Sequence, residues 1–281
     1  MRIANVSGRA HLVVDGRLVD VEKASGRRLP ADPMALIASL DAVGELPVPD
    51  DASALDGVAL DPPVPRPTKI VAIGLNYRGH AEESGLEPPE QPVVFAKLPS
   101  SLAGPTADIV IPGGRTRVDW EAELVLVVGR RGRHIAEADA WSHVAGVTGG
   151  QDISDREEQF RALRQFTMAK SFDTYSPLGP VVTTIDELHD PDDLAVACRL
   201  DGETVQSSRT GDLIFPVPAL IAWISRICTL EPGDLIFTGT PAGVGDGRKP
   251  PRYLAPGNVV ETEIEGVGTM RNACVAGPTY G

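Results

Sequence analysis

The chain has 281 residues, enough for one large domain or for a main domain with a smaller partner. Its hydrophobic fraction of 42% is ample for a packed core, and 29 glycines with 25 prolines predict many turns. A formal net charge of -13, with no run of basic residues, argues against nucleic acid or an anionic membrane as a partner, because both would repel the chain.

The first 66 residues predict a small α+β domain. The segment MRIANVSGRAHLVVDGRLVDVEK has apolar runs on both sides of an Asp15-Gly16 turn, a hairpin signal that predicts two or three short strands. The segment DPMALIASLDAV has apolar residues at helical spacing after Asp32-Pro33, which predicts a helix. The proline-rich stretch LDPPVPRPTK then predicts an extended linker. We therefore expect a boundary between residues 1–66 and a larger domain at residues 67–281.

The sequence of the larger domain predicts mostly strands. The clearest helices are REEQFRALRQF (156–166) and VPALIAWISRI (217–227). Strands and helices do not alternate regularly, so we expect a mainly β, α+β architecture with an antiparallel or mixed sheet and helices at its edges. The predicted strands are KIVAIG (69–74), VVFAK (93–97), DIVIP (108–112), AELVLVVG (122–129), VAGVTGG (144–150), LAVACRL (194–200), DLIFTG (234–239) and VVETEIEG (259–266).

Two glutamates at the head of an apolar strand are the first candidate site. Side chains alternate along a strand, so Glu121 and Glu123 point to the same face. Asp152 follows a second predicted buried strand and a glycine pair, so it could approach them. Three carboxylates without cysteine or histidine ligands favour Mg²⁺ or Mn²⁺, with Ca²⁺ a weaker fit. The alternative is that these acids are simply solvated at a strand end.

A histidine and a glutamate after the strand at 69–74 form the second candidate. If the segment from Arg78 is helical, His80 and Glu83 stand three residues apart on one face. A carboxylate that holds one ring nitrogen orients the imidazole and raises its basicity, which suits a general base toward water. The alternative is an ordinary His-Glu pair on an exposed helix.

Further polar residues follow Asp152. Arg156, Gln159 and Lys170 supply two cations and an amide that could bind a substrate carboxylate or oxyanion, although a charged surface face would have the same pattern. The stretch GDLIFTGTPAGVGDG runs from a strand into a glycine-rich loop that carries Thr240. The loop lacks the lysine spacing of a phosphate-binding loop, and no predicted helix follows it. Two interpretations are left: the loop binds a ligand, or it simply reverses the chain.

Three scattered cysteines, Cys198, Cys228 and Cys274, show no C-x-x-C spacing. Their odd number, together with a polar first segment, predicts a reduced, cytoplasmic compartment, and each cysteine is expected to be a small buried hydrophobe. No apolar stretch approaches the roughly 18 residues that cross a bilayer, so we expect no membrane partner.

Six motifs occur in one order along the chain. They are N-Y-x-x-H-x-x-E (76–83), F-x-K-x-x-S (95–100), D-W-E-A-E-L (119–124), D-x-x-x-R-x-x-Q (152–159), K-S-F-D-T (170–174) and G-T-P-x-G-V-G (239–245). Together they resemble the fumarylacetoacetate hydrolase family, in its acylpyruvase and 2-hydroxyhepta-2,4-diene-1,7-dioate isomerase-like branch. The resemblance runs from about residue 69 to 272, which is most of the chain.

The resemblance implies a mixed β-roll catalytic domain behind a small N-terminal domain, and a homodimer. By position it implies that Glu121, Glu123 and Asp152 bind Mg²⁺ or Mn²⁺. It also implies roles for six further residues: the water-activating dyad His80 and Glu83, the catalytic Lys170 and Gln159, and the substrate-binding Arg156 and Thr240.

The resemblance further implies a small-molecule 2-oxo acid as substrate. We expect a metal-dependent hydrolase that cleaves the C–C bond of a 1,3-dicarbonyl 2-oxo acid, of the acylpyruvate or fumarylacetoacetate type. The alternative is a 2-oxo acid decarboxylase or isomerase, for example one acting on oxaloacetate. A non-catalytic ligand-binding relative is a third possibility, against which the retention of all nine site positions argues.

Overall fold

The structure is a computed structural model, and it describes residues 1–161 and 164–279. The fold is mainly β, as predicted, with one large sheet and two smaller ones. Neighbouring strands are mostly antiparallel, and β15–β4, β12–β6 and β17–β7 are parallel pairs, so the sheets are mixed. Within the described residues, no helix combines the length and the apolar character that crossing a membrane requires.

The N-terminal segment forms three strands, as its sequence predicts, and two short helices, of which only the second is predicted. Asp32 caps the second helix, because its side chain accepts a hydrogen bond from the amide of Met34 at 3.3 Å. That helix ends at Ile37, earlier than predicted, and a short 3₁₀ turn continues the segment. The elements are β1 (Arg2–Val6), β2 (Arg9–Val14), β3 (Arg17–Asp20), α1 (Val21–Ala24), α2 (Pro33–Ile37) and η1 (Leu40–Ala42).

The ten-stranded sheet has the order β3-β2-β1-β12-β10-β9-β15-β4-β5, with β6 beside β12. The pairing of β1 with β12 makes the N-terminal strands part of this sheet. The predicted domain boundary at residue 66 stays a prediction. The further strands of this sheet are β4 (Ile70–Gly74), β5 (Val93–Lys97), β6 (Leu102–Ala103), β9 (Ala122–Val128), β10 (Val144–Gln151), β12 (Ser176–Thr183) and β15 (Leu235–Phe237).

A five-stranded sheet of order β14-β13-β16-β17-β7 packs beside the large sheet, and β8 and β11 form a two-stranded ladder. The remaining strands are β7 (Ile109–Gly113), β8 (Val118–Asp119), β11 (Ser154–Asp155), β13 (Ala195–Leu200), β14 (Glu203–Arg209), β16 (Val259–Ile264) and β17 (Gly268–Thr279). All eight predicted strands are present. The sequence does not predict the strands β6, β8, β11, β12, β14 and β17.

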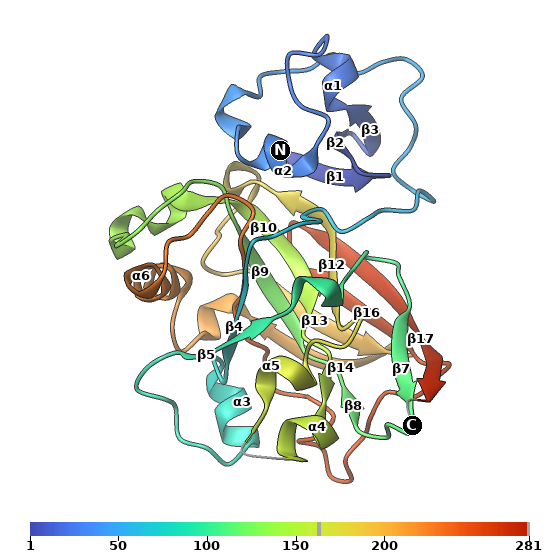
Figure 1. Ribbon diagram of the computed structural model, residues 1–281, viewed down its shortest axis with the longest axis vertical. Helices are drawn as coiled ribbons and strands as arrows, with labels where there is room; N and C mark the ends of the chain where they lie inside the picture. The colour runs from blue at the N-terminus through green and yellow to red at the C-terminus, as the bar shows by residue number, and fades with distance from the viewer. Residues whose placement is uncertain (162–163, 280–281) are drawn as a thin grey trace.

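The helices lie around the sheets. In Figure 1, α3, α4 and α5 gather at the end of the molecule opposite the N-terminal segment, and α6 lies at the side. The predicted helix at 156–166 is wrong as one continuous helix, because α4 ends at Arg161 and residues 164–165 are not helical. Its residues 162–163 lie outside the described part. The bounds are α3 (Arg78–Glu83), α4 (Arg156–Arg161), α5 (Phe166–Ala169) and α6 (Val217–Ile227), with 3₁₀ turns η2 (Pro99–Ser101), η3 (Glu137–His143), η4 (Ile185–Glu187) and η5 (Thr210–Asp212).

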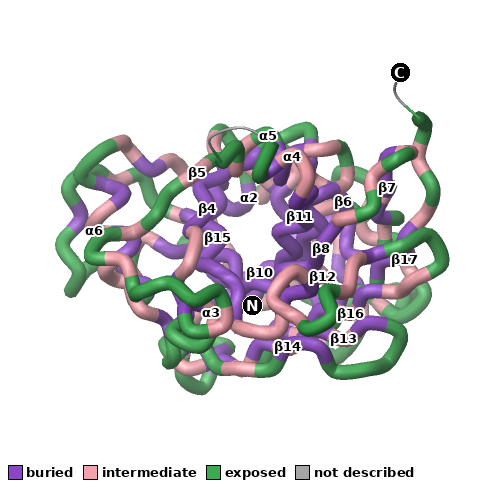
Figure 2. The backbone as a smooth tube through the Cα atoms, turned by 90° about the horizontal axis from the view of Figure 1, so that it is seen from below, coloured by how far each residue is buried: buried purple, intermediate pink, exposed green. Residues whose placement is uncertain are grey.

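The strand β9 is buried on both faces and separates two apolar clusters. Leu124 and Leu126 belong to the cluster between the large sheet and the five-stranded sheet. Val125 and Val127 belong to a second cluster, which also contains Ile37 and other residues of the N-terminal segment. Figure 2, viewed from the end opposite that segment, shows buried parts of β4, β10, β12 and β15 arranged in a ring. Since residues 121, 123, 125 and 127 share a face, the two glutamates point to the side of the second cluster.

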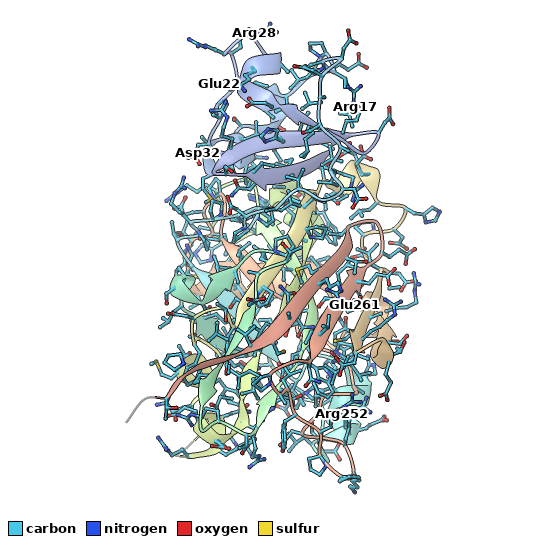
Figure 3. The ribbon with its side chains drawn as sticks, turned by 90° about the vertical axis from the view of Figure 1, so that its right-hand side faces the viewer. Arg17, Glu22, Arg28, Asp32, Arg252 and Glu261 are labelled. Carbon is cyan, nitrogen blue, oxygen red and sulfur yellow. The ribbon has the colours of Figure 1, made fainter. Side chains whose placement is uncertain are left out.

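The N-terminal segment and the candidate site lie at opposite ends of the large sheet. Figure 3 shows Arg17 and Glu22 at the end formed by the N-terminal strands, and Arg252 at the other end. The second apolar cluster joins them, because it includes Ile3 and Leu36 from the segment and Phe237 at the end of β15. The N-terminal segment therefore covers one end of the large sheet, and the polar residues of the candidate site lie at the other end.

Candidate functional site

Three carboxylates meet where β9 begins and β10 ends. The two strands pair so that Ala122 lies opposite Gln151, and the amide of Asp152 donates to the carbonyl of Glu121 at 2.9 Å. One carboxylate oxygen from each of Glu121, Glu123 and Asp152 lies within 4.8 Å of the others. All three side chains are buried. The structure thus brings together the three residues that the sequence predicts as metal ligands.

Three buried cations surround these carboxylates. Lys170 Nζ lies 2.6 Å from Glu121 Oε2 and 2.6 Å from Asp152 Oδ2. Lys97 Nζ lies 2.5 Å from Asp152 Oδ1, and Lys97 also donates to the backbone carbonyl of Lys170. The third cation, Arg156, contacts Glu121 at 2.6 Å. Each of these pairs is desolvated, so its electrostatic interactions are much stronger than those of a surface pair.

The two glutamates differ in their pKa although they are neighbours on one face. Burial and the charges of Asp152 and Glu121 raise the pKa of Glu123 well above its usual range. Burial also opposes ionisation of Glu121, but Lys170, Arg156 and His80 outweigh it and hold the pKa of Glu121 well below its usual range. Glu123 is therefore the carboxylate with the least cationic compensation, although a backbone amide donates to it.

The donor set fits a divalent metal ion. It consists of carboxylate oxygens alone, which are the ligands that Mg²⁺ and Mn²⁺ prefer. The site also contains Asp119, so four buried carboxylates face three buried cations among the described residues. Glu121, Glu123 and Asp152 would bind a divalent cation together. The positive charge of the ion would offset the repulsion between these carboxylates, which raises the pKa of Glu123.

The predicted dyad lies on α3, directly after β4. His80 Nδ1 lies 3.3 Å from Glu83 Oε2, and both side chains are largely buried. The helix is fixed at its start by Asn76, whose side-chain amide donates to the carbonyls of Phe215 and Thr238. Burial disfavours the charged form of Glu83, but hydrogen bonds from His80 and from the Gly243 amide lower its pKa below the usual range. Glu83 is thus kept ionised beside the imidazole.

The glycine-rich loop after β15 binds carboxylates with its backbone amides. The amide of Gly239 donates to Glu123 at 2.7 Å, and that of Gly243 donates to Glu83 at 3.0 Å. The amide of Gly245 donates to Asp119 at 2.6 Å. The loop thus connects the dyad with the carboxylate cluster.

Glycine is required at two of these loop positions. Gly239 and Gly243 have φ angles of +103° and +106°. A Cβ at Gly243 would lie 2.1 Å from the carbonyl oxygen of Val205, and one at Gly239 would lie 2.7 Å from the Cβ of Asn76. The sequence predicts ligand binding or simple turning for this loop, and the structure shows that it also holds the side chains of the site.

Two residues predicted to bind substrate are already engaged with the protein. Arg156 donates to Asp119 through Nε and Nη2, to Glu121 through Nη2 and to Gln159 Oε1 through Nη1. The hydroxyl of Thr240 donates to the carbonyl of Ala122 at 2.9 Å and accepts from Gln206. Both side chains lie in the site, and their contact with a substrate stays a prediction, as do the catalytic roles of Lys170 and Gln159.

Three residues of the site received no role from the sequence. Lys97 and Asp119 lie within two of the six family motifs, but nothing in the motif spacing shows that Lys97 pairs with Asp152 or that Asp119 pairs with Arg156. Gln206 lies on β14, a polar edge strand without any motif. Their contacts join segments far apart in the chain, so no local pattern reveals them.

The chain is similar to several curated proteins. A family model described as fumarylacetoacetate (FAA) hydrolase C-terminal matches residues 69–275. Oxaloacetate tautomerase Fahd2a, mitochondrial, of Rattus norvegicus is 45% identical over 213 residues, covering 76% of this chain and 68% of the relative. Oxaloacetate tautomerase FAHD2A, mitochondrial, of Homo sapiens is 45% identical over 214 residues, with the same shares.

Solved structures of similar proteins match nearly the whole chain. A Mycobacterium smegmatis protein given the name HpcE provisionally has a TM-score of 0.92 and 49% identity, covering 98% of this chain and 99% of its own. Maleylpyruvate hydrolase from Sphingobium sp. SYK-6, in complex with manganese (II) ion and pyruvate, has a TM-score of 0.81 and 31% identity, covering 99% and 100%. The family model and these relatives confirm the resemblance seen in the motifs, and the chain belongs to the fumarylacetoacetate hydrolase family.

Proposed function

We propose that this chain is a divalent-metal-dependent enzyme that forms and re-protonates the enolate of a 2-oxo acid, with keto–enol interconversion of oxaloacetate as the first candidate reaction. The observation that carries the proposal is the buried cluster of Glu121, Glu123 and Asp152 with three cations around it. The choice of oxaloacetate is supported by the names of relatives that are 45% identical to the chain.

The three carboxylates would hold a Mg²⁺ or Mn²⁺ ion. When bound, the ion would supply Lewis-acid polarisation of a 2-oxo group and its neighbouring carboxylate. Manganese and pyruvate in the maleylpyruvate hydrolase support this assignment, since that structure combines a divalent ion with a 2-oxo acid.

The dyad supplies the proton transfer. Because Nδ1 of His80 faces the ionised Glu83, the other ring nitrogen, Nε2, is the one that acts as base. His80 would take a proton from the carbon next to the 2-oxo group, and the electron pair of that C–H bond becomes the enolate double bond. Protonation of the enolate oxygen gives the enol, and the reverse steps return the keto acid without loss or gain of atoms. Lys170 and Gln159 would stabilise the negative oxygen during this transfer.

Hydrolytic C–C cleavage is the second candidate, because a histidine oriented by a carboxylate can also activate water. His80 would take a proton from water, and the hydroxide would add to the distal carbonyl of an acylpyruvate. The C–C bond then breaks, its electron pair leaves on the enolate of the 2-oxo acid, and protonation at carbon completes the product. Decarboxylation would form the same enolate by loss of CO₂ and needs no attacking water.

Two further assignments accompany the proposal. We infer a homodimer from the family resemblance and a cytoplasmic location from the cysteine pattern. The described Cys198, Cys228 and Cys274 are all free thiols, which is compatible with a reduced compartment.

One assay tests the proposal and separates its candidates. Metal-stripped protein is mixed with oxaloacetate or an acylpyruvate, with and without Mg²⁺ or Mn²⁺, while enol absorbance, CO₂ and acid products are followed. Metal-dependent loss of enol without CO₂ supports the tautomerase, and two acids from the acylpyruvate support the hydrolase. Metal-dependent CO₂ release supports the decarboxylase. If none of these reactions depends on added metal, the proposal is wrong.

A further inference from the structure

The side chain of Gln206 points into the protein from a strand whose other residues, apart from Val205, are polar and largely exposed. The pairing of β13 with β14 shifts register between Cys198 and Arg199, which marks a β-bulge beside Val205. Two consecutive residues, Val205 and Gln206, are consequently both buried, whereas alternation would bury only one of them. The bulge thus turns Gln206 toward the carboxylate site, and only 2% of this residue is exposed.

Gln206 contacts the two segments that build the site. Its Oε1 accepts a hydrogen bond from the amide of Ala122 at 3.0 Å, and Ala122 stands between Glu121 and Glu123. Its Nε2 donates to the hydroxyl of Thr240 and to the carbonyl of Pro241, both at 2.8 Å. One side chain therefore ties the start of β9 to the glycine-rich loop.

The neighbouring amide is held in the same way by a second glutamine. Gln151 Oε1 accepts from the amide of Glu121 at 2.9 Å, and Gln151 Nε2 donates to Thr262 Oγ1 at 2.8 Å. Consecutive backbone amides, at residues 121 and 122, are thus each bound by a buried glutamine. An amide side chain suits this task because it accepts and donates at once.

We propose that Gln206 is a positioning residue that fixes the metal-binding glutamates against the Thr240 loop. This inference rests on the proposed metal-dependent function. The same loop donates amides to Glu123, Glu83 and Asp119, so loosening its attachment to Ala122 disturbs both the metal ligands and the dyad. Residues that orient metal ligands in this way contribute strongly to metal affinity although they do not touch the metal.

The test compares Mn²⁺ affinity in the wild-type protein and in two variants, by titration with the electron paramagnetic resonance signal of free Mn²⁺. Gln206→Leu removes the acceptor and both donors, and Gln206→Met removes them with an unbranched side chain of similar length. We expect both variants to bind Mn²⁺ about 10- to 100-fold more weakly in the absence of any substrate. If Gln206→Leu does not fold, Gln206→Met provides the measurement.

A matched control separates positioning from general destabilisation. Asn272 is also a fully buried amide, and its Nδ2 donates to the carbonyls of Gly104 and Ala107, away from the carboxylates. Asn272→Leu should lower the melting temperature of the metal-free protein while Mn²⁺ affinity stays at the wild-type value. A merely structural Gln206 would behave in the same way.

The outcomes distinguish this inference from the function on which it rests. If the wild-type protein binds no Mn²⁺, the proposed function fails. If the wild type binds Mn²⁺ and both Gln206 variants bind it equally well, the proposed role of Gln206 is wrong although the function stands. Weaker binding in both variants with wild-type affinity in Asn272→Leu supports the role. At saturating metal, kcat should still be reduced, because the loop also holds Glu83.

Discussion

Two buried carboxylates at opposite ends of β15 show how a structural acid differs from a candidate metal ligand. Asp234 precedes the strand, is fully buried, and accepts hydrogen bonds from the amides of Lys69 at 3.1 Å and Glu231 at 2.7 Å. Thr68 also donates to it, and Lys69 Nζ lies 2.5 Å away. Every donor comes from the surrounding loops, so this acid is compensated within the protein and stabilises the turn before β15.

Glu123, beside the other end of β15, has different surroundings. Among the described residues, its one hydrogen bond comes from the amide of Gly239, and two further carboxylates lie within 4.8 Å. The charges of those neighbours contribute to its raised pKa. Burial alone therefore does not mark a functional acid. A functional acid is better identified by burial next to other carboxylates, where the protein supplies too few cations and hydrogen-bond donors to balance their charge.

The largest expected effect is that of Glu123→Gln. Loss of one ligand should abolish Mn²⁺ binding and lower activity by about 10³-fold or more, because the electrostatic stabilisation by a metal amounts to several kcal/mol. The metal-free variant should be at least as stable as the wild type, because glutamine replaces a carboxyl group whose ionisation is opposed by burial and by two neighbouring carboxylates. Calorimetric Mn²⁺ titration and thermal melts in chelator measure both quantities. Unchanged Mn²⁺ affinity would contradict the assignment of Glu123.

The next effect is that of His80→Ala. A general base contributes about 10²- to 10⁴-fold, so most activity should be lost, while Mn²⁺ affinity should stay near the wild-type value. Steady-state kinetics at saturating metal, together with the same titration, provide the check. Glu83→Gln serves as a graded control, because it keeps the side-chain shape but weakens the contact with Nδ1. Activity of His80→Ala at the wild-type rate would show that the assigned base is wrong.

Asp234→Ala should reverse the pattern expected for Glu123→Gln. It leaves the amides of Lys69 and Glu231 without their acceptor, which should cost about 2 kcal/mol of unfolding free energy and lower the melting temperature by about 5 °C. Mn²⁺ affinity of the folded variant should not change. A change in metal affinity with unchanged stability would break the distinction between the two ends of β15.

The sequence predicts much of the fold because apolar runs dominate it. The strand β9 and the helix α6 match their apolar segments closely. The strand β12 escapes such reasoning because Pro177 and Pro180 interrupt its apolar residues, and the ladder with β10 shifts register near this region. The strand β14 is mostly polar, since it lies at the edge of its sheet.

The site is predictable to the extent that its chemistry is local. Alternation along a strand places Glu121 and Glu123 on one face, and helical spacing places His80 next to Glu83. Contacts across the fold are not predictable in this way: the pairing of Lys97 with Asp152 joins residues 55 positions apart. Thr240 illustrates the limit, because its hydroxyl binds the backbone of Ala122, a contact that its motif does not reveal.

The smallest expected effect concerns the N-terminal segment, at the end of the large sheet away from the carboxylate site. Burial opposes ionisation of Asp20, but hydrogen bonds from Arg9 and from the amide of Lys23 outweigh it and lower the pKa of Asp20 to about 2. A carboxylate with a lowered pKa stabilises the fold above its unfolded pKa of 3.8 and loses that contribution as the pH falls toward 2. Because Arg9 is 36% exposed and partly screened, Asp20→Asn should cost about 1 kcal/mol of unfolding free energy at neutral pH.

Denaturant melts of the variant and the wild type, in chelator, should show this difference in unfolding free energy at neutral pH and a shrinking difference below about pH 4. A difference that grows on acidification would contradict the assigned ion pair, and any loss of Mn²⁺ affinity in this variant would show that the two ends of the sheet are coupled.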